Sequence, residues 1–159
     1  DTQIVTLPWK RLASRQDALD YAAAVAPQTR KTTDAGTAIA SVLQFSHGQL
    51  MRAPFPATRS VIDIITDGKD NYRRPVRPVR DVIVAQGVTI NALAVLNQVR
   101  DLDDYLRDRV IGGDGAFVEE AASYEDFAPA FKRKLLREIG DLKFAFTSPQ
   151  MGEKDSETQ

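Results

Sequence analysis

The 159-residue chain contains no cysteine, which excludes disulfide bonds, thiolate metal sites and cysteine nucleophiles. Its single histidine, His47, excludes a multi-histidine metal centre and gives no basis for a Ser-His-Asp set. No apolar run approaches the ~20 residues that are needed to span a bilayer. A phosphate-cradling glycine loop is missing too, because the glycines at 112, 113 and 115 precede a predicted strand and favour a hairpin-like turn.

Net charge is also nearly absent. A value of −1 gives no bulk electrostatic argument for binding nucleic acid or an anionic membrane. The charges are unevenly spread, however. Residues 69–80 hold five basic side chains and one acid, and residues 101–126 hold nine acids and two arginines. Such runs are usually solvated faces, and a docking surface is the alternative.

Hydrophobic periodicity and turn residues predict an alternation of strands and helices. Such an order indicates an α/β fold, a doubly wound, mainly parallel sheet with helices on both faces. Predicted strands cover residues 3–9, 60–65, 88–96 and 116–119, and predicted helices cover 16–26, 37–51, 76–86, 101–110 and 123–139.

Two of these strands, 60–65 and 88–96, are so apolar that both of their faces should be buried. We expect one domain over residues 1–146. Residues 147–159 are polar and without periodicity, and we expect them to be a disordered tail.

Thr37 and Asp67 fall where such a sheet binds ligands, beyond the carboxyl ends of its strands. Asp67 directly follows the strand at 60–65, and the loop of Thr37 leads into a helix and can reach the same edge. A carboxylate and a hydroxyl from two adjacent loops are oxygen ligands of the kind that Mg²⁺ takes. On spacing alone, simpler roles are favoured: a turn residue for Asp67 and a helix N-cap for Thr37.

Asp63 interrupts the apolar strand at 60–65. Four residues of strand span ~13 Å, so Asp63 cannot share a metal ion with Asp67. We expect a buried structural acid, held by hydrogen bonds or by an arginine. A carboxylate with a raised pKa and a role in proton transfer is the alternative.

Five stretches taken together resemble the von Willebrand factor A domain, and more narrowly a bacterial subgroup of that superfamily whose function is uncharacterised. The resemblance covers roughly residues 3–140. The stretches are DAGTAI at 34–39, RSVIDIITDG at 59–68, GVTINALAVL at 87–96, VIGGDGAFV at 110–118 and FKRKLLREI at 131–139.

The resemblance implies a Rossmann-like fold with a metal-ion-dependent adhesion site. That site joins a D-x-S-x-S loop, a threonine and an aspartate, and Thr37 and Asp67 match the last two. D-x-S-x-S does not occur in this chain. The resemblance places it, with the family's first strand, first helix and second strand, before Asp1, so the fold is expected to be incomplete without these N-terminal strands. A processed or truncated N-terminus is expected for the same chain, because it begins without methionine.

The function implied by the resemblance is a non-enzymatic module for adhesion or assembly. Its divalent cation, Mg²⁺ or else Mn²⁺ or Ca²⁺, would capture a carboxylate of a protein partner, with ligands outside this chain completing the site. The partner could also be the chain's own N-terminal fragment. Membership of the subgroup suggests a bacterial, periplasmic or otherwise exported protein. Candidate partner contacts around the site are Asp34, Asp70, Asn71, Tyr72 and Arg73.

Two alternatives stay open. The first is a metal-free structural subunit of a larger assembly, docked through its charged faces. The second is a phosphoryl-transfer enzyme with Asp67 as nucleophile. The sequence disfavours this enzyme, since Lys69 and Asp70 follow Gly68 and no second carboxylate stands two residues after Asp67.

Overall fold

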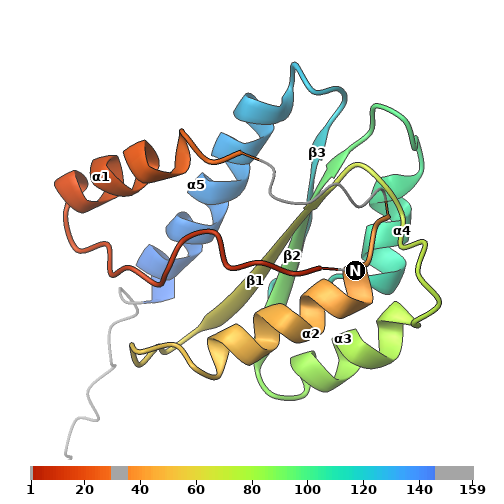
Figure 1. Ribbon diagram of the computed structural model, residues 1–159, viewed down its shortest axis with the longest axis horizontal. Coiled ribbons are helices and arrows are strands. Elements are labelled where there is room, and N and C mark those ends of the chain that lie inside the picture. Colours follow the sequence, from red (N-terminus) through yellow and green to blue (C-terminus); the bar gives the residue numbers. More distant parts are fainter. Residues whose placement is uncertain (1, 30–35, 146–159) are drawn as a thin grey trace, which may run out of the picture.

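The computed structural model describes residues 2–29 and 36–145, with side chains as far as residue 140. Three strands form one parallel sheet in the order β1-β2-β3, an α/β, Rossmann-like arrangement (Figure 1). The elements in chain order are α1 (Arg15–Val25), α2 (Ile39–Leu50), β1 (Ser60–Thr66), α3 (Val76–Val84), β2 (Val88–Val95), α4 (Leu102–Arg109), β3 (Val118–Ala121) and α5 (Phe127–Ala145).

Helices cover both faces of the sheet, as the sequence predicts. Apolar side chains of α2, α3 and α4 form one core with β1 and β2, and Leu43, Ile90 and Leu106 are wholly buried in it. On the opposite face, α5 packs through Phe127, Ala130 and Phe131 against β2 and β3. Figure 1 shows α2 and α3 on one side of the strands and α5 on the other.

β2 is the central strand, and all eight of its residues are buried. β1 lies at an edge of the three-stranded sheet, where burial alternates: Ile62 and Ile64 are buried, whereas Asp63 and Ile65 are exposed. The prediction that both strands are buried on both faces is therefore confirmed for β2 and wrong for β1. The reason is that α2 covers one face of β1, while α5 packs on β2 and β3.

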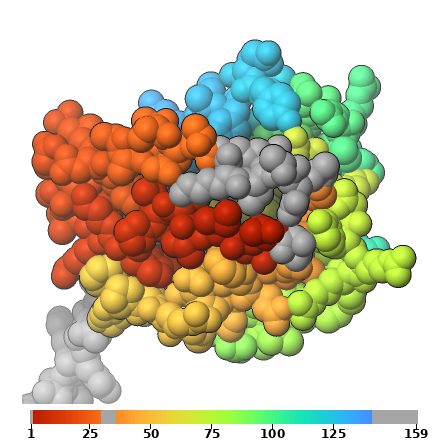
Figure 2. All heavy atoms as spheres, in the orientation of Figure 1, coloured from red at the N-terminus to blue at the C-terminus, as the bar shows by residue number. Residues whose placement is uncertain are grey.

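The predicted strand at residues 3–9 is wrong. Residues 2–13 form no regular secondary structure, and no backbone hydrogen bond joins them to β1 in the described part of the chain. Pro8 has no backbone N–H to donate to a ladder, which is one physical reason. In Figure 2 this segment, in red, lies on the molecular surface above α2.

α1 confirms the predicted helix at 16–26 with a small shift. The hydroxyl of Ser14 accepts a hydrogen bond from the amide of Asp17 at 3.1 Å, which fixes the first turn. No residue of α1 is buried, and α1 packs against no other described helix or strand. Its apolar stripe, which includes Leu19, is therefore exposed.

Two boundaries near the C-terminus differ from the prediction. β3 begins at Val118 instead of 116, and α5 begins at Phe127 instead of 123. Ser123 donates a hydrogen bond to Asp126 at 2.9 Å, which holds a turn where the sequence predicts the start of a helix. None of the helices in the described part of the chain is both long and apolar enough to cross a bilayer.

Candidate functional site

The candidate site lies where β1 ends and a tight turn begins. The hydroxyl of Thr66 donates to the carbonyl of Gly68 at 2.9 Å and accepts from the amide of Gly68 at 3.2 Å. These two hydrogen bonds close the turn and place Asp67 at its exposed tip. Asp67 is therefore a turn residue, as its spacing in the sequence favours. It is exposed to solvent beyond the carboxyl end of the sheet.

Thr37 lies directly against this turn. A Cβ atom placed on Gly68 would be only 3.2 Å from Thr37 Oγ1, so the hydroxyl touches the chain next to Asp67. The structure therefore brings the two predicted site residues to one edge of the sheet. The simpler role for Thr37 is wrong, because the N-cap residue of α2 is Ala38.

Asp70 and Asn71 fasten the loop after β1 to the start of α2. The Asp70 carboxylate accepts hydrogen bonds from the amides of Ala40 at 3.2 Å and Tyr72 at 3.1 Å. The side-chain Oδ1 of Asn71 accepts a hydrogen bond from the backbone amide of Thr37 at 2.8 Å. The backbone amide of Asn71 donates one to the carbonyl of Thr37 at 3.0 Å. Ala38 has no polar side chain, so Asp70 supplies the missing cap from another loop.

The remaining predicted partner contacts are differently placed. Tyr72 packs over Gly36, where a Cβ atom would collide with the tyrosine ring. Arg73 is exposed and makes no ion pair with any described residue. Asp34 lies outside the described residues. Their role as partner contacts stays a prediction.

One contact of Asp67 was missed by the sequence reasoning. The Tyr124 hydroxyl donates a hydrogen bond to the Asp67 carboxylate, and this bond raises the pKa of Tyr124. Tyr124 follows β3, whose carboxyl end lies at the same edge of the sheet as that of β1. That shared edge is the signal from which the contact could have been inferred.

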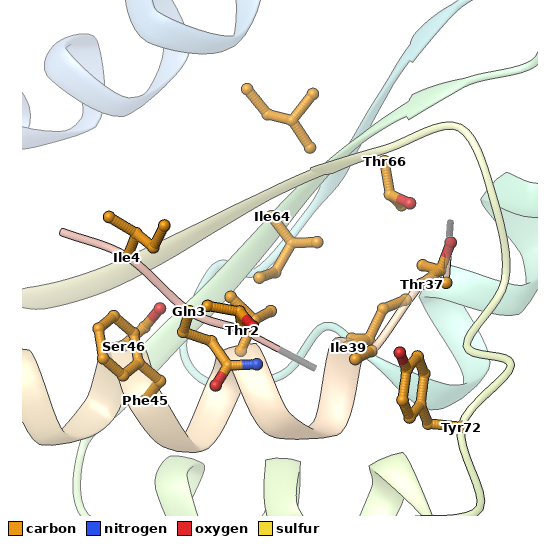
Figure 3. A pocket seen from close by; sticks show the side chains of 14 residues that line it. Thr2, Gln3, Ile4, Thr37, Ile39, Phe45, Ser46, Ile64, Thr66 and Tyr72 are labelled. Carbon is orange, nitrogen blue, oxygen red and sulfur yellow. The ribbon is translucent and has the colours of Figure 1, made fainter. Parts of the chain in front are cut away.

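A hollow of about 420 Å³ opens beside the turn, between α2, the end of β1 and the N-terminal segment (Figure 3). Ile39 and Ile64 supply apolar walls, and the hydroxyls of Thr37 and Thr66 lie at one end. Thr2, Gln3 and Ile4 line the opposite side. The edge of β1 that pairs with no other described strand borders a partly polar space that leads to Thr37.

The oxygen atoms near the turn suit a hard cation in kind but not in number. Mg²⁺ takes about six oxygen ligands, and Thr37 and Asp67 are two candidate donors. Among the described residues no group of three or more histidine, aspartate or glutamate side chains could hold a metal ion. A complete cation site would need ligands from elsewhere.

A second polar cluster lies under α5. Lys134 is wholly buried and forms ion pairs with Asp63 and, at 2.6 Å, with Glu138. Asn91 donates to Glu138 at 2.8 Å and accepts from the amide of Phe117 at 3.1 Å. Asp63 is thus held by a lysine, where the sequence prediction named an arginine among the possible partners.

The side chain of Asp63 is 36% exposed, so the expected buried acid is only partly buried. The partial desolvation under α5, reinforced by the neighbouring Glu138, still raises the pKa of Asp63 from 3.8 to about 6. Burial also acts to raise the pKa of Glu138, but hydrogen bonds with Asp63, Lys134 and Asn91 outweigh it and lower that pKa. The sequence carried a signal for Lys134: it stands three or four residues from Ala130, Phe131 and Glu138 on the inner face of α5.

The chain matches a known protein family. The model of a family described as a protein of unknown function (DUF1194) matches residues 1–143. No curated protein and no solved structure matches the chain. Because the matched segment spans most of the 159 residues, the chain belongs to the DUF1194 family.

Proposed function

We propose that the chain is part of a protein-binding module of the von Willebrand factor A type, in which a divalent cation at the carboxyl edge of the sheet captures a carboxylate of a partner protein. The observation that carries this proposal is the contact between the Thr37 hydroxyl and the Asp67–Gly68 turn. A hydroxyl and a carboxylate on adjacent loops form part of the coordination shell of Mg²⁺ or a similar hard cation. The role is binding without catalysis, in a bacterial, exported protein.

The free edge of β1 supports this proposal. A further strand paired with this edge in the same direction as β1 would end close to Asp67 and the Thr37 hydroxyl. The resemblance places the D-x-S-x-S loop after such a strand. Ligands from that loop, water molecules and a carboxylate of the partner would complete the shell.

The test is cation binding by the intact natural protein that contains this chain. We expect Mg²⁺ or Mn²⁺ to raise its Tm and to give a saturable heat of binding. Asp67→Asn and Thr37→Val should abolish both effects, and Thr37→Ser should retain them because it keeps the hydroxyl. Asp114→Asn, an exposed substitution outside the site, is the control.

If Mg²⁺ changes neither the Tm nor the partner binding of the protein with Asp67 intact, the cation-dependent function is overturned. A second candidate function would then stand: a metal-free structural subunit docked through its charged faces. The observation in its favour is a surface on which Arg73, Arg74, Arg77 and Arg109 lie together. Assembly of this kind would survive EDTA and Asp67→Ala, and would fail when Arg73 and Arg77 are both replaced by glutamate.

A further inference from the structure

We propose that an arginine-lined hollow beside the start of α3 binds a short acidic segment, rich in aspartate or glutamate, of a partner protein. The proposal gives the second candidate function a defined surface and a partner chemistry, and rests on that docking function alone. It requires no cation.

The hollow has a volume of about 270 Å³ and lies between the loop after β1, the first turn of α3 and the side chains of Tyr105 and Arg109 on α4. Basic and aromatic side chains from two separate segments of the chain, residues 72–77 and 105–109, come together in it. Its basic and aromatic lining consists of Arg73, Arg74, Arg77, Arg109, Tyr72 and Tyr105. One acid, Asp70, also lines the hollow, and its carboxylate accepts hydrogen bonds from the backbone amides of Ala40 and Tyr72.

The positive charge of this hollow is only partly balanced. Asp108 forms ion pairs with both Arg77 and Arg109, and one carboxylate cannot neutralise two guanidinium groups. Arg74 donates to the uncharged Gln44, and Arg73 has no ion-pair partner among the described residues. Within the described residues, the four arginines of the hollow therefore exceed its two neighbouring carboxylates, Asp70 and Asp108, by two positive charges.

The first turn of α3 adds to this positive potential. Pro75 is its N-cap residue and has no side chain that can accept a hydrogen bond, and no acid follows in the first turn. Helix N-termini carry a partial positive charge that a carboxylate normally offsets, whereas this one carries Arg77. A partner carboxylate at this position would cap α3 and pair with the arginines at the same time.

Two features favour an acidic peptide over a nucleic acid. Guanidinium groups form paired hydrogen bonds with carboxylates, and the rings of Tyr72 and Tyr105 offer apolar contact to a peptide chain. A long polyanion would also have to pass the acids of α4, since Asp103 and Asp104 lie on the helix that forms one wall of the hollow. A short acidic segment avoids that repulsion.

The experiment measures binding of a fluorescent poly-glutamate peptide to the intact protein in buffer containing EDTA. We expect saturable binding that weakens as salt is added, and none for a poly-glutamine peptide of the same length. Arg73→Glu together with Arg74→Glu should weaken binding by at least about tenfold, the effect of losing one charge-assisted contact. Neither arginine pairs with an acid of the described residues, so the fold should survive, as a circular dichroism spectrum would verify.

Arg52→Glu is the matched control, because Arg52 is exposed and lies at the far end of α2. It should bind the peptide as wild type does, and so should Asp67→Ala, which separates this site from the proposed cation site. Equal binding by the double variant and wild type would overturn the proposal. So would tighter binding of a single-stranded oligonucleotide than of poly-glutamate.

Discussion

At the scale of single residues, Asp63 is the least expected side chain in the sheet. It stands in the middle of an apolar strand, 36% exposed, and pairs with a lysine that has no contact with solvent. Asn91, its neighbour in the register of β1 and β2, connects to the same cluster through Glu138. A charged residue in such a strand is tolerated because each polar atom around it has a partner.

The raised pKa of Asp63 gives a pH dependence of stability with a defined sign. The folded protein holds a proton at Asp63 more tightly than the unfolded chain does, so this residue stabilises the fold below pH 3.8. The contribution is lost as the pH rises through about 6. The free energy of unfolding of wild type, relative to that of Asp63→Asn, should therefore fall between these two pH values.

Urea denaturation at a series of pH values measures this difference. Ser60→Ala, in the same strand and without a titrating group, is the control, and its difference from wild type should stay constant. A difference between wild type and Asp63→Asn that is flat across the range, or that rises with pH, would contradict the prediction.

Gly113 is required by both its conformation and its surroundings. Its φ is +94°, and a Cβ atom would come within 2.8 Å of backbone atoms of Val88 and Thr89. Gly115 has a φ of +64° with open space around it. We expect Gly115→Ala to cost about 1–2 kcal/mol from the left-handed backbone alone, and Gly113→Ala to cost clearly more.

Thermal and urea denaturation of these two variants check the prediction, because the pair separates backbone strain from steric conflict. Equal losses of stability would show that the loop moves aside without difficulty.

The site could be predicted in part at this scale. Thr37 and Asp67 were placed at one edge because strand ends of a parallel sheet share an edge, a rule that needs only the order of elements. The hydrogen bonds of Asp70 and Asn71 could not be predicted, since they depend on how the loop folds back onto α2. The pairing of Asp63 with Lys134 joins positions 71 residues apart, and no local pattern specifies it.

At the scale of elements, α5 is held to the sheet by both apolar and ionic contacts. Phe127, Ala130 and Phe131 pack at its first half, and Lys134 and Glu138 continue the same inner face. Burying a charge is tolerated only with well-placed partners, so this half of the helix depends on the ion-pair geometry.

Lys134→Met should reduce the free energy of unfolding by about 3–5 kcal/mol at neutral pH, because it leaves Asp63 and Glu138 facing each other without a cation. Adding Asp63→Asn and Glu138→Gln to Lys134→Met should recover much of that loss. Lys132→Met, on the exposed side of α5, is the control and should change stability by less than about 0.5 kcal/mol.

Urea denaturation of the three proteins gives these values. If Lys134→Met alone proved as stable as wild type, the ion pairs would contribute nothing to the docking of α5.

Periodicity predicted the five helices and the three paired strands of the described residues. All of them except α1, whose apolar stripe is exposed, have an apolar face against the core. The predicted strand at 3–9 failed because a strand exists only through a pairing partner, which alternation in one segment cannot reveal. The exposed face of β1 was missed for a related reason. An apolar sequence indicates that a strand can be buried, but it does not show which neighbouring elements cover each of its faces.

At the scale of the whole molecule, the sheet of the described residues has one strand with neighbours on both sides, β2, and two edge strands, β1 and β3. Ala92, Leu93 and Ala94 of β2 pair with both β1 and β3, and Val95 pairs with β3. β1 pairs with β2 alone in the described structure, and the N-terminal segment near its other edge makes no backbone hydrogen bond with it. In a parallel pair the amides of an edge strand point alternately to the partner and away from it.

Amide hydrogen exchange, read residue by residue by NMR, should reflect this asymmetry. Amides of β1 should alternate between slow and fast exchange, and those of residues 92–95 should all exchange slowly. Slow exchange along all of β1 in the 159-residue chain by itself would mean that another of its own segments pairs with the outer edge, and would contradict the topology described above.

Because Lys134 is buried, its chemical labelling reports local unfolding of α5 from the sheet. Lys132 and Lys134 stand two residues apart on α5, one exposed and the other without any contact with solvent. An amine-acylating reagent should label Lys132 at the rate of a free lysine, and Lys134 only when α5 lifts from the sheet. The ratio of the two labelling rates then measures the fraction of molecules in which α5 is locally detached from the sheet. Lys132, in the same peptide, serves as the internal reference.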